Sequence, residues 1–382
     1  MTNHTHEPAV RRSRTRIPAT AATATAAALA ASLLAGCSAG DEEDAKGPGP
    51  AASSPHQSKA PAPKAPTHAP STPSPKAPTH APSTPAPAPG TFAPYVDTSL
   101  RPSYDLLKGA RQTGVKEYTL AFVSPGDGCV PKWGGRQELG DNPVARQADR
   151  LRAQGGEVRI SFGGQSGNEL ARVCGSVDKL VDAYRKVIDA YHLTKADFDI
   201  EGPALTDTKA NDLRARAIAR LQQSRKLDVS FTLPVIPSGL NRDSLAVLNS
   251  AQKNGVRVSA VNIMAMDYGT YYDGDMGKYA IDAATATHRQ IKAALGIHSE
   301  AAAWKAVGVT PMIGVNDVKG EVFRPDDAAE LKAFAEKKGL GRLSMWSLTR
   351  DKPCPEGANI KAQATCSSIG KNSNEFVRAF TG

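Results

Sequence analysis

Three acidic residues alternate with apolar residues in the run ADFDIEG at positions 196–202. If this run forms a β-strand, successive side chains point to opposite faces, so Asp197, Asp199 and Glu201 share one face. Crowded like charges raise the pKa of at least one carboxyl group. A carboxyl group that stays protonated near neutral pH can act as a general acid toward a leaving group. The alternative use for such a trio is a metal site or a cluster of salt bridges.

The elements that must position these acids begin at Thr91, where the composition changes. From there, short β-branched or aromatic runs alternate with longer amphipathic stretches, which is typical of βα units around a parallel sheet. We predict eight strands, at 92–98, 118–124, 158–162, 196–201, 228–234, 260–266, 307–313 and 343–347. Helices are predicted between them, for example over 181–191, 211–223 and 328–338. Eight strands favour an α/β fold with a single (β/α)8 barrel, a TIM barrel, over 91–382, with its chemistry at the carboxyl ends of the strands.

Four motifs resemble those of family 18 glycoside hydrolases, the chitinases and their relatives. The acidic run resembles the DxxDxDxE signature of that family, and SFGG at 161–164 resembles its SxGG motif. The run MAMDY at 264–268 is similar to the family's Met-x-Tyr-Asp segment, and Trp346 stands where the family has a tryptophan at the floor of the sugar site. The motifs occur in the family's order, and the likeness is strongest to secreted actinobacterial members.

The resemblance implies a role for each acid. Glu201 would protonate the glycosidic oxygen, while the substrate's own acetamido oxygen attacks the sugar carbon in place of a carboxylate nucleophile. Asp199 would orient the acetamido N–H group, and Asp197 would share a proton with Asp199. Asp267 would bind the acetamido group or the sugar, and Trp346 would stack beneath the sugar ring. Two successive inversions would retain the anomeric configuration.

The chain departs from the family pattern at three positions. Thr194 and Lys195 replace the first Asp of DxxDxDxE and the Gly that usually follows it. Met266 replaces the tyrosine that steadies the acetamido carbonyl in the family. Tyr268 lies two residues farther on, so alternation along a strand would place it on the same face as Met266. We therefore expect Tyr268 to substitute for the family's tyrosine.

Further substrate-binding candidates surround these motifs. The predicted substrate-binding residues are Asp267, Tyr268, Trp346, Met266, Ser161 and Tyr95. Ser161 and the glycines beside it are expected to support the acids rather than to touch substrate. Candidate sugar-stacking platforms at the rim are Tyr95, Trp133, Tyr271 and Tyr272. A plain packing role is the alternative for each of these aromatic residues.

The first 37 residues resemble a bacterial export signal. A basic segment ends at Arg16, and an Ala-rich stretch follows that is too weakly apolar for a permanent membrane span. The run LAGC at 34–37 resembles a lipobox, in which Cys37 becomes the lipidated N-terminus; the alternative is an ordinary signal peptide with a chance cysteine. We expect a secreted lipoprotein held at the outer face of the cell membrane.

A low-complexity linker is predicted at 38–90. The sequence PKAPTHAPSTP occurs at 63–73 and again at 75–85, and such segments have little apolar surface to bury. Proline favours an extended, disordered stalk. Much of the formal net charge of +9 lies in this region and the export signal. Since no basic face with interleaved aromatic residues is present, we expect no nucleic-acid partner.

Four cysteines remain beyond Cys37: Cys129, Cys174, Cys354 and Cys366. An even number of cysteines in an oxidising compartment predicts disulfides, and three pairings are possible. We favour Cys129–Cys174 and Cys354–Cys366, because each pair closes a local loop. None of these cysteines has the spacing of zinc ligands, so we expect neither a metal nor a cofactor.

The motifs together predict a chitinase-type glycosidase, a monomer that cleaves β-1,4-linked N-acetylglucosamine polymers. One alternative is an endo-β-N-acetylglucosaminidase that releases N-glycans from glycoproteins with the same acids. The other is a non-catalytic barrel that binds chitin or its oligosaccharides. Non-catalytic relatives usually lose the terminal glutamate of the signature, so the presence of Glu201 favours turnover.

Overall fold

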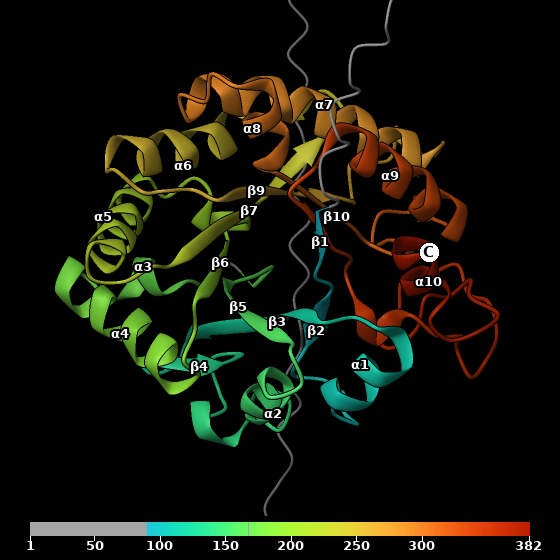
Figure 1. Ribbon diagram of the computed structural model, residues 1–382, viewed down its shortest axis with the longest axis horizontal. Coiled ribbons are helices and arrows are strands. Elements are labelled where there is room, and N and C mark those ends of the chain that lie inside the picture. The colour runs from blue at the N-terminus through green and yellow to red at the C-terminus, as the bar shows by residue number, and fades with distance from the viewer. Residues whose placement is uncertain (1–89, 167) are drawn as a thin grey trace, which may run out of the picture. The chain divides into compact units, whose positions relative to one another are not determined.

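Eight runs of the chain lie side by side in parallel and close into a barrel (Figure 1). The structure, a computed structural model, describes residues 90–166 and 168–382. The expected export signal with its lipidated Cys37, and the expected linker up to residue 89, lie outside these described residues. The division of the chain into 1–37, 38–90 and 91–382 therefore stays a prediction.

The barrel strands follow one another around the sheet in chain order. They are β1 (Thr91–Phe92), β2 (Tyr95–Asp97), β3 (Glu117–Pro125), β5 (Glu157–Gly163), β6 (Lys195–Asp199), β7 (Asp228–Ile236), β9 (Ala260–Ala265), β10 (Val307–Pro311) and β13 (Arg342–Leu343). β1 and β2 belong to one extended run, which closes the barrel. On one side, Ala93 donates its N–H to the carbonyl of Leu343 at 2.9 Å, and on the other, Pro94 accepts from Thr119 at 2.9 Å. The predicted eight-stranded (β/α)8 barrel is confirmed.

Short antiparallel pairings add two strands to the barrel sheet and form a separate two-stranded sheet. β4 (Pro131–Trp133) pairs with β3, β8 (Gly239–Leu240) pairs with β7, and β11 (Gly314–Val315) pairs with β12 (Val322–Phe323). The last barrel strand is shorter than predicted, since β13 ends at Leu343. An isolated bridge between Met312 and Trp346 continues its pairing, so Trp346 still lies beside the end of β10.

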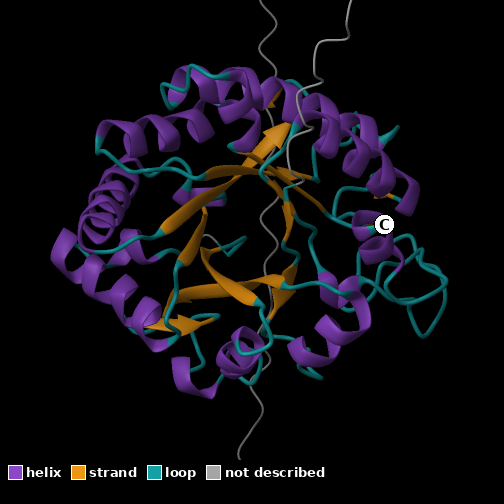
Figure 2. Cartoon of the chain, in the orientation of Figure 1, coloured by secondary structure: helices purple, strands orange, loops and turns teal. Residues whose placement is uncertain are grey.

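Helices cover the outside of the barrel (Figure 2). They are α1 (Leu106–Thr113), α2 (Ala148–Arg152), α3 (Leu170–Val173), α4 (Val177–Ala190), α5 (Thr208–Ser224), α6 (Arg242–Lys253), α7 (Met276–Ala294), α8 (Glu300–Lys305), α9 (Pro325–Lys338) and α10 (Glu375–Thr381). The three helices predicted above are present, with earlier starts. Ser176 and Asp207 fix the starts of α4 and α5, because their side chains accept N–H groups of the first turn. Within the described residues, none of the helices has the length and apolar character needed to cross a membrane.

Aromatic side chains fill the layer between the barrel and the helices. Phe162 of β5 and Phe198 of β6 are paired in register, and their rings stack with centroids 5.3 Å apart. Tyr184 of α4 contacts both rings edge-on. Side chains alternate along a strand, so the burial of Phe198 beneath α4 turns Asp197 and Asp199 toward the barrel interior.

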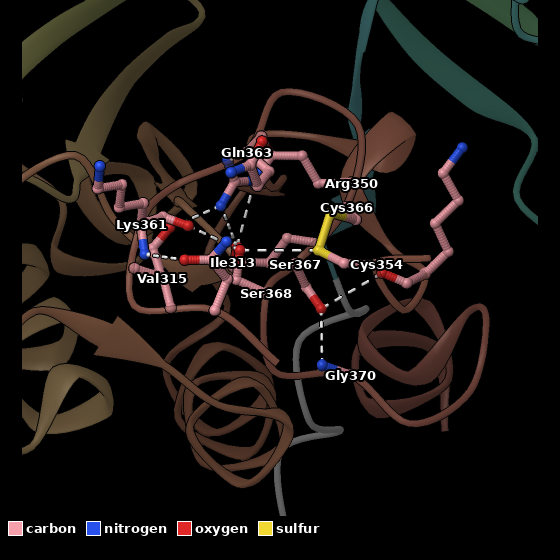
Figure 3. The surroundings of a disulfide bond; sticks show 12 residues. Ile313, Val315, Arg350, Cys354, Lys361, Gln363, Cys366, Ser367, Ser368 and Gly370 are labelled. Carbon is pink, nitrogen blue, oxygen red and sulfur yellow. Dashed lines mark hydrogen bonds between the residues drawn. A yellow bond between two sulfur atoms is a disulfide. The ribbon is translucent and has the colours of Figure 1, made fainter. Parts of the chain in front are cut away.

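Both predicted disulfides are confirmed. Cys129, in the loop after β3, is bonded to Cys174 at the end of α3, across 45 residues of the chain. Cys354 is bonded to Cys366 and closes a 12-residue loop in the C-terminal part, where Arg350 lies beside it (Figure 3). A bond across the longer loop removes more entropy from the unfolded chain, by about 1 kcal/mol in the loop-closure model.

Candidate active site

Asp197 lies deepest among the three acids of β6 and is surrounded by hydroxyl groups. Its side chain is fully buried. Its Oδ2 accepts hydrogen bonds from Tyr95 at 2.9 Å and from Ser161 at 2.7 Å. Its Oδ1 accepts from Thr232 at 2.9 Å and from Ser230. The proton sharing with Asp199 that the family resemblance implies has no counterpart among these hydrogen bonds and stays a prediction.

A buried polar layer supports these hydroxyl groups from the neighbouring strands. Asn262 of β9 donates to Thr232 at 3.0 Å and accepts from Thr310 of β10 at 2.9 Å. Arg342 of β13, also buried, donates to Ser230 at 3.3 Å. We did not anticipate this layer from the sequence. A signal was present, because Ser230, Thr232, Asn262 and Thr310 stand at alternate positions that the barrel turns inward.

Asp199 and Glu201 lie nearer the carboxyl end of β6 in a different environment. Asp199 is 4% exposed, and its Oδ1 has no hydrogen-bond partner among the described residues. Burial raises the pKa of Asp199 well above its usual value, and the charges of Glu201 and Asp197 add to the effect. Burial, with a smaller contribution from Asp267, raises the pKa of Glu201 to about 7. Near neutral pH, Glu201 therefore exists both as an acid and as a carboxylate.

These two acids line a cavity of about 260 Å³ at the carboxyl ends of the strands. The other lining residues are Tyr95, Phe122, Gln165, Gly202, Thr232, Pro234, Val235, Met264, Met266, Asp267, Thr310, Met312, Asp317 and Trp346. Apolar walls with a few converging polar groups are typical of small-molecule sites. Sequence reasoning missed Gln165, Met312 and Asp317, which follow strand ends without forming a recognisable motif.

Aromatic rings form one wall of the cavity. Trp346 stacks on Phe122 with centroids 5.5 Å apart and an interplanar angle of 24°, and Tyr95 contacts Trp346 edge-on. The glycines of the SFGG run make room for these groups. A Cβ atom on Gly164 would lie 2.8 Å from the Phe122 ring, and one on Gly163 would lie 2.1 Å from the carbonyl oxygen of Asp199.

A second, larger hollow of about 780 Å³ lies next to this cavity. Phe122, Gln165 and Trp346 line both of them, so the two hollows are neighbours. The loops after β2, β3 and β5 provide the remaining walls of the second hollow.

Two of the four proposed rim platforms are buried, which corrects those predictions. Tyr95 is 2% exposed because the barrel turns it inward onto Asp197. Trp133 is 3% exposed and donates its Nε1–H to Tyr191 at 2.7 Å. Tyr272 packs edge-on against Tyr268 at the partly buried base of its loop.

Tyr271 is the fourth proposed platform, and its side chain is 93% exposed. No ring contact holds it among the described residues, which leaves its face open to solvent. Its role as a stacking platform stays a prediction.

The expectation that Tyr268 replaces the family's tyrosine is wrong in its geometry. β9 ends at Ala265, and Asp267 has a left-handed φ of 50°, so the alternation of a strand does not continue to Tyr268. Tyr268 is 8% exposed, packs against Tyr272 and Tyr279, and does not line the cavity. Met266 and Asp267 do line it.

The other two departures from the family pattern lie away from the cavity. Thr194 and Lys195 are at the amino end of β6, opposite the end that carries Glu201. Lys195 forms an ion pair with Glu117 at 2.7 Å, and Thr194 hydrogen-bonds Glu157 at 3.4 Å. They therefore leave the hydrogen bonds around Asp197 untouched. In the described part of the chain, no group of three or more His, Cys, Asp or Glu side chains is arranged to hold a metal ion.

Curated relatives of the chain are chitinases. No protein-family model matches it. The probable bifunctional chitinase/lysozyme of Escherichia coli K12 is 35% identical over 287 residues, which cover 70% of this chain and 31% of that protein. Endochitinase 11 of Metarhizium anisopliae is 34% identical over 278 residues, which cover 68% of this chain and 52% of that protein. The chain thus spans between 31% and 52% of the length of these relatives.

Solved structures agree with these relatives. The catalytic domain of the hyperthermophilic chitinase from Pyrococcus furiosus is 35% identical with a TM-score of 0.70, covering 78% of this chain and 97% of that one. A GH18 chitinase from Flavobacterium johnsoniae shares the fold, at 14% identity and a TM-score of 0.50. The barrel and its inward-facing acids define the class, a (β/α)8 protein with an acidic cavity. The chain belongs to the chitinase family.

Proposed function

We propose that this chain hydrolyses β-1,4-linked N-acetylglucosamine polymers, with Glu201 as the general acid. One observation carries the proposal: a carboxyl group with a pKa of about 7, that of Glu201, lines an aromatic-walled cavity together with Asp199, whose buried Oδ1 has no hydrogen-bond partner among the described residues. The Pyrococcus furiosus chitinase provides further support, since variants of its active domain have been solved with chito-oligosaccharides bound.

In this proposal the substrate supplies its own nucleophile. Glu201 donates its proton to the glycosidic oxygen as the bond breaks, and the acetamido oxygen of the same sugar attacks C1 to form an oxazolinium ion. The free Oδ1 of Asp199 accepts the acetamido N–H, which orients that attack. The carboxylate form of Glu201 then takes a proton from water as the water opens the ring. Two inversions at C1 give net retention.

Chromogenic chitobiose and chitotriose glycosides test this proposal with the wild type and Glu201→Gln. Glu356→Gln is the matched control, because Glu356 is exposed and lies in the loop closed by Cys354 and Cys366. We expect hydrolysis by the wild type and the control but not by Glu201→Gln. Equal rates for the wild type and Glu201→Gln would rule out Glu201 as the acid.

Two other assays separate the competing functions. Release of N-glycans from a denatured glycoprotein, without cleavage of chitotriose, would favour an endo-β-N-acetylglucosaminidase. Binding of chitotriose by calorimetry without turnover of any substrate would favour a non-catalytic sugar-binding barrel. The two neighbouring hollows, of about 260 and 780 Å³, support an oligosaccharide rather than a single sugar as the ligand.

We further propose that the protein is exported and anchored through a lipid on Cys37 as a monomer. The paired state of the four other cysteines supports an oxidising compartment. Detergent phase partition of the full chain expressed in a bacterium tests the anchor. We expect the wild type in the detergent phase and Cys37→Ser in the aqueous phase; the same partition for both would contradict the anchor. Light scattering of Cys37→Ser tests the monomeric state.

A further inference from the structure

Asp267 is held in the cavity wall by an unusual turn. The turn, residues 267–269, follows β9 directly, and Asp267 has a left-handed φ of 50°. Gly269 has a φ of 120°, which side chains rarely tolerate. Non-glycine residues in the left-handed region are held there by their surroundings. The direction of the Asp267 carboxyl group therefore depends on what holds this turn.

Two carboxylate–backbone hydrogen bonds cross between this turn and the segment 316–321, which joins β11 to β12. The Val318 N–H donates to Asp267 Oδ1 at 3.0 Å. In the opposite direction, the Gly269 N–H donates to Glu321 Oε1 at 2.9 Å. Each segment thus supplies one carboxylate and one N–H group to the other. We call this pair of bonds the reciprocal clamp.

Glu321 is buried behind the cavity rather than in it. Its side chain is fully buried, it does not line the cavity, and its Oε2 has no partner among the described residues. Burial raises the pKa of Glu321 to about 7, and the nearby N–H groups of the 267–269 turn act against that rise. A buried carboxyl group with a single strong hydrogen bond is unfavourable for stability. Its position is better explained by the turn that it holds.

The chain directly before the segment 316–321 is held by the C-terminal part of the chain (Figure 3). The guanidinium group of Arg350 donates to the carbonyl of Ile313 at 3.0 Å and to that of Gln363 at 2.6 Å. The N–H of Val315 donates to the carbonyl of Ser367 at 3.0 Å, directly after Cys366 of the Cys354–Cys366 disulfide. These contacts hold Ile313 and Val315, directly before the segment 316–321 that carries one half of the clamp.

We propose that Glu321 is a positioning residue for the cavity, which acts through the reciprocal clamp to direct Asp267 at the sugar. This inference rests on the proposed hydrolysis of N-acetylglucosamine polymers. Glu321 touches no substrate. Its removal frees the Gly269 N–H and lets the 267–269 turn relax out of the left-handed conformation, which moves the Asp267 carboxyl group.

Steady-state kinetics on a chromogenic chitotrioside test the proposal with Glu321→Ala, Glu321→Gln and the matched control Asp351→Ala. Asp351 is also a buried carboxyl group that accepts backbone N–H groups, from Phe376 and Val377, but it does not line the cavity. We expect Glu321→Ala to lower kcat/KM about 10- to 100-fold, mainly by raising KM, since small misplacements have effects of this size. Glu321→Gln keeps an oxygen acceptor for Gly269 and should recover most of the loss.

A double-mutant cycle separates positioning from general destabilisation. If Glu321 acts through Asp267, adding Glu321→Ala to Asp267→Ala causes little further loss in kcat/KM. Additive losses in this cycle, a loss as large in Asp351→Ala, or no loss in a folded Glu321→Ala variant would each overturn the proposal. Hydrogen exchange of the Gly269 amide should also accelerate in Glu321→Ala and not in Asp351→Ala.

A failure of the proposed function is distinguishable from a failure of this inference. If the wild type does not hydrolyse the chitotrioside, the proposed hydrolysis fails at that step. Calorimetric binding of chitotriose then tests the clamp by itself. Weaker binding by Glu321→Ala than by Glu321→Gln would support the positioning role, and equal binding by the wild type and Glu321→Ala would overturn it.

Discussion

Two carboxyl groups on β6, one deep in the barrel and one nearer the carboxyl end of the strand, have opposite surroundings. Asp197, deep in the barrel, accepts hydrogen bonds on its two oxygens from four hydroxyl groups, which come from three different strands. Asp199, two residues farther along the same strand, leaves one buried oxygen without a partner among the described residues. Both side chains are buried and face inward. The difference lies entirely in what the neighbouring strands place around each carboxyl group.

This contrast indicates how one strand supplies two functions. A buried carboxylate that is fully hydrogen-bonded stabilises its surroundings and holds a fixed geometry. A buried carboxyl group without partners has a raised pKa and an oxygen free for a ligand. Asp197 therefore forms the base of the site, while Asp199 and Glu201 meet the substrate. Substitutions that separate these two parts give the following predictions.

Glu201→Gln should have the largest effect on activity. Loss of the general acid is expected to lower kcat by about 10²–10⁴-fold. Burial raises the pKa of Glu201 to about 7, and donation requires the protonated form, so wild-type activity should fall as the pH rises above that value. The pH profile of kcat/KM on a chitotrioside measures this limb. If the residual activity of Glu201→Gln falls over the same alkaline pH range, the titrating group is a residue other than Glu201.

Asp199→Asn should separate activity from stability. The variant weakens the contact between residue 199 and the acetamido group of the substrate, so kcat/KM is expected to fall about 10²-fold. The folded state raises the pKa of Asp199, so its charge opposes folding once the pH exceeds the pKa of the unfolded chain. The variant should therefore unfold at a higher temperature than the wild type at pH 7, and this gain should vanish at low pH. A lower Tm for Asp199→Asn at pH 7 would contradict the conclusion that the surroundings of Asp199, unlike those of Asp197, disfavour its charge.

The sequence predicts the barrel and the acids, but not the groups that give each acid its environment. The eight strands follow from short β-branched or aromatic runs that alternate with amphipathic stretches, and the inward trio follows from the alternation of residues between Ala196 and Glu201. The hydroxyl groups around Asp197 come from Tyr95 and Thr232, which are 102 and 35 residues away in sequence. Only the closed barrel determines which of these side chains meet.

The expectations for Tyr95 and Tyr268 were wrong, like that for Trp133, because the surrounding structure rather than the local sequence determines where each side chain lies. Tyr95 was a candidate platform at the rim, yet the barrel turns it inward and leaves it 2% exposed. Tyr268 was placed in the cavity by extending strand alternation through Asp267, whose left-handed φ of 50° ends that alternation. Nothing in the sequence around Asp267 indicates the reciprocal clamp that holds this turn, since Glu321 lies 54 positions farther along the chain.

Asp197→Asn should have the reverse profile of Asp199→Asn. In the wild type, the surrounding hydroxyl groups donate to the Asp197 carboxylate, whereas the variant places an NH₂ group among them. Each hydrogen bond to a charged group contributes about 1.5–3 kcal/mol. We expect a loss of about 2–4 kcal/mol in the free energy of unfolding, measured by urea titration. Activity should fall less than in Asp199→Asn once measured at a temperature where both variants are folded. A variant as stable as the wild type would show that these hydroxyl groups are replaceable.

Tyr268→Phe should have the smallest effect, and Tyr95→Phe is its matched comparison. The Tyr268 hydroxyl is buried without a partner among the described residues, so its removal is expected to leave stability unchanged or slightly higher. The Tyr95 hydroxyl donates to Asp197 at 2.9 Å, and its removal should reduce stability by about 1–3 kcal/mol. Because Tyr268 does not line the cavity, kcat/KM should also stay within about twofold of the wild type. A marked loss of turnover in Tyr268→Phe would place that hydroxyl at the sugar after all, and the boundary between the supporting layer and the cavity would then have to be redrawn.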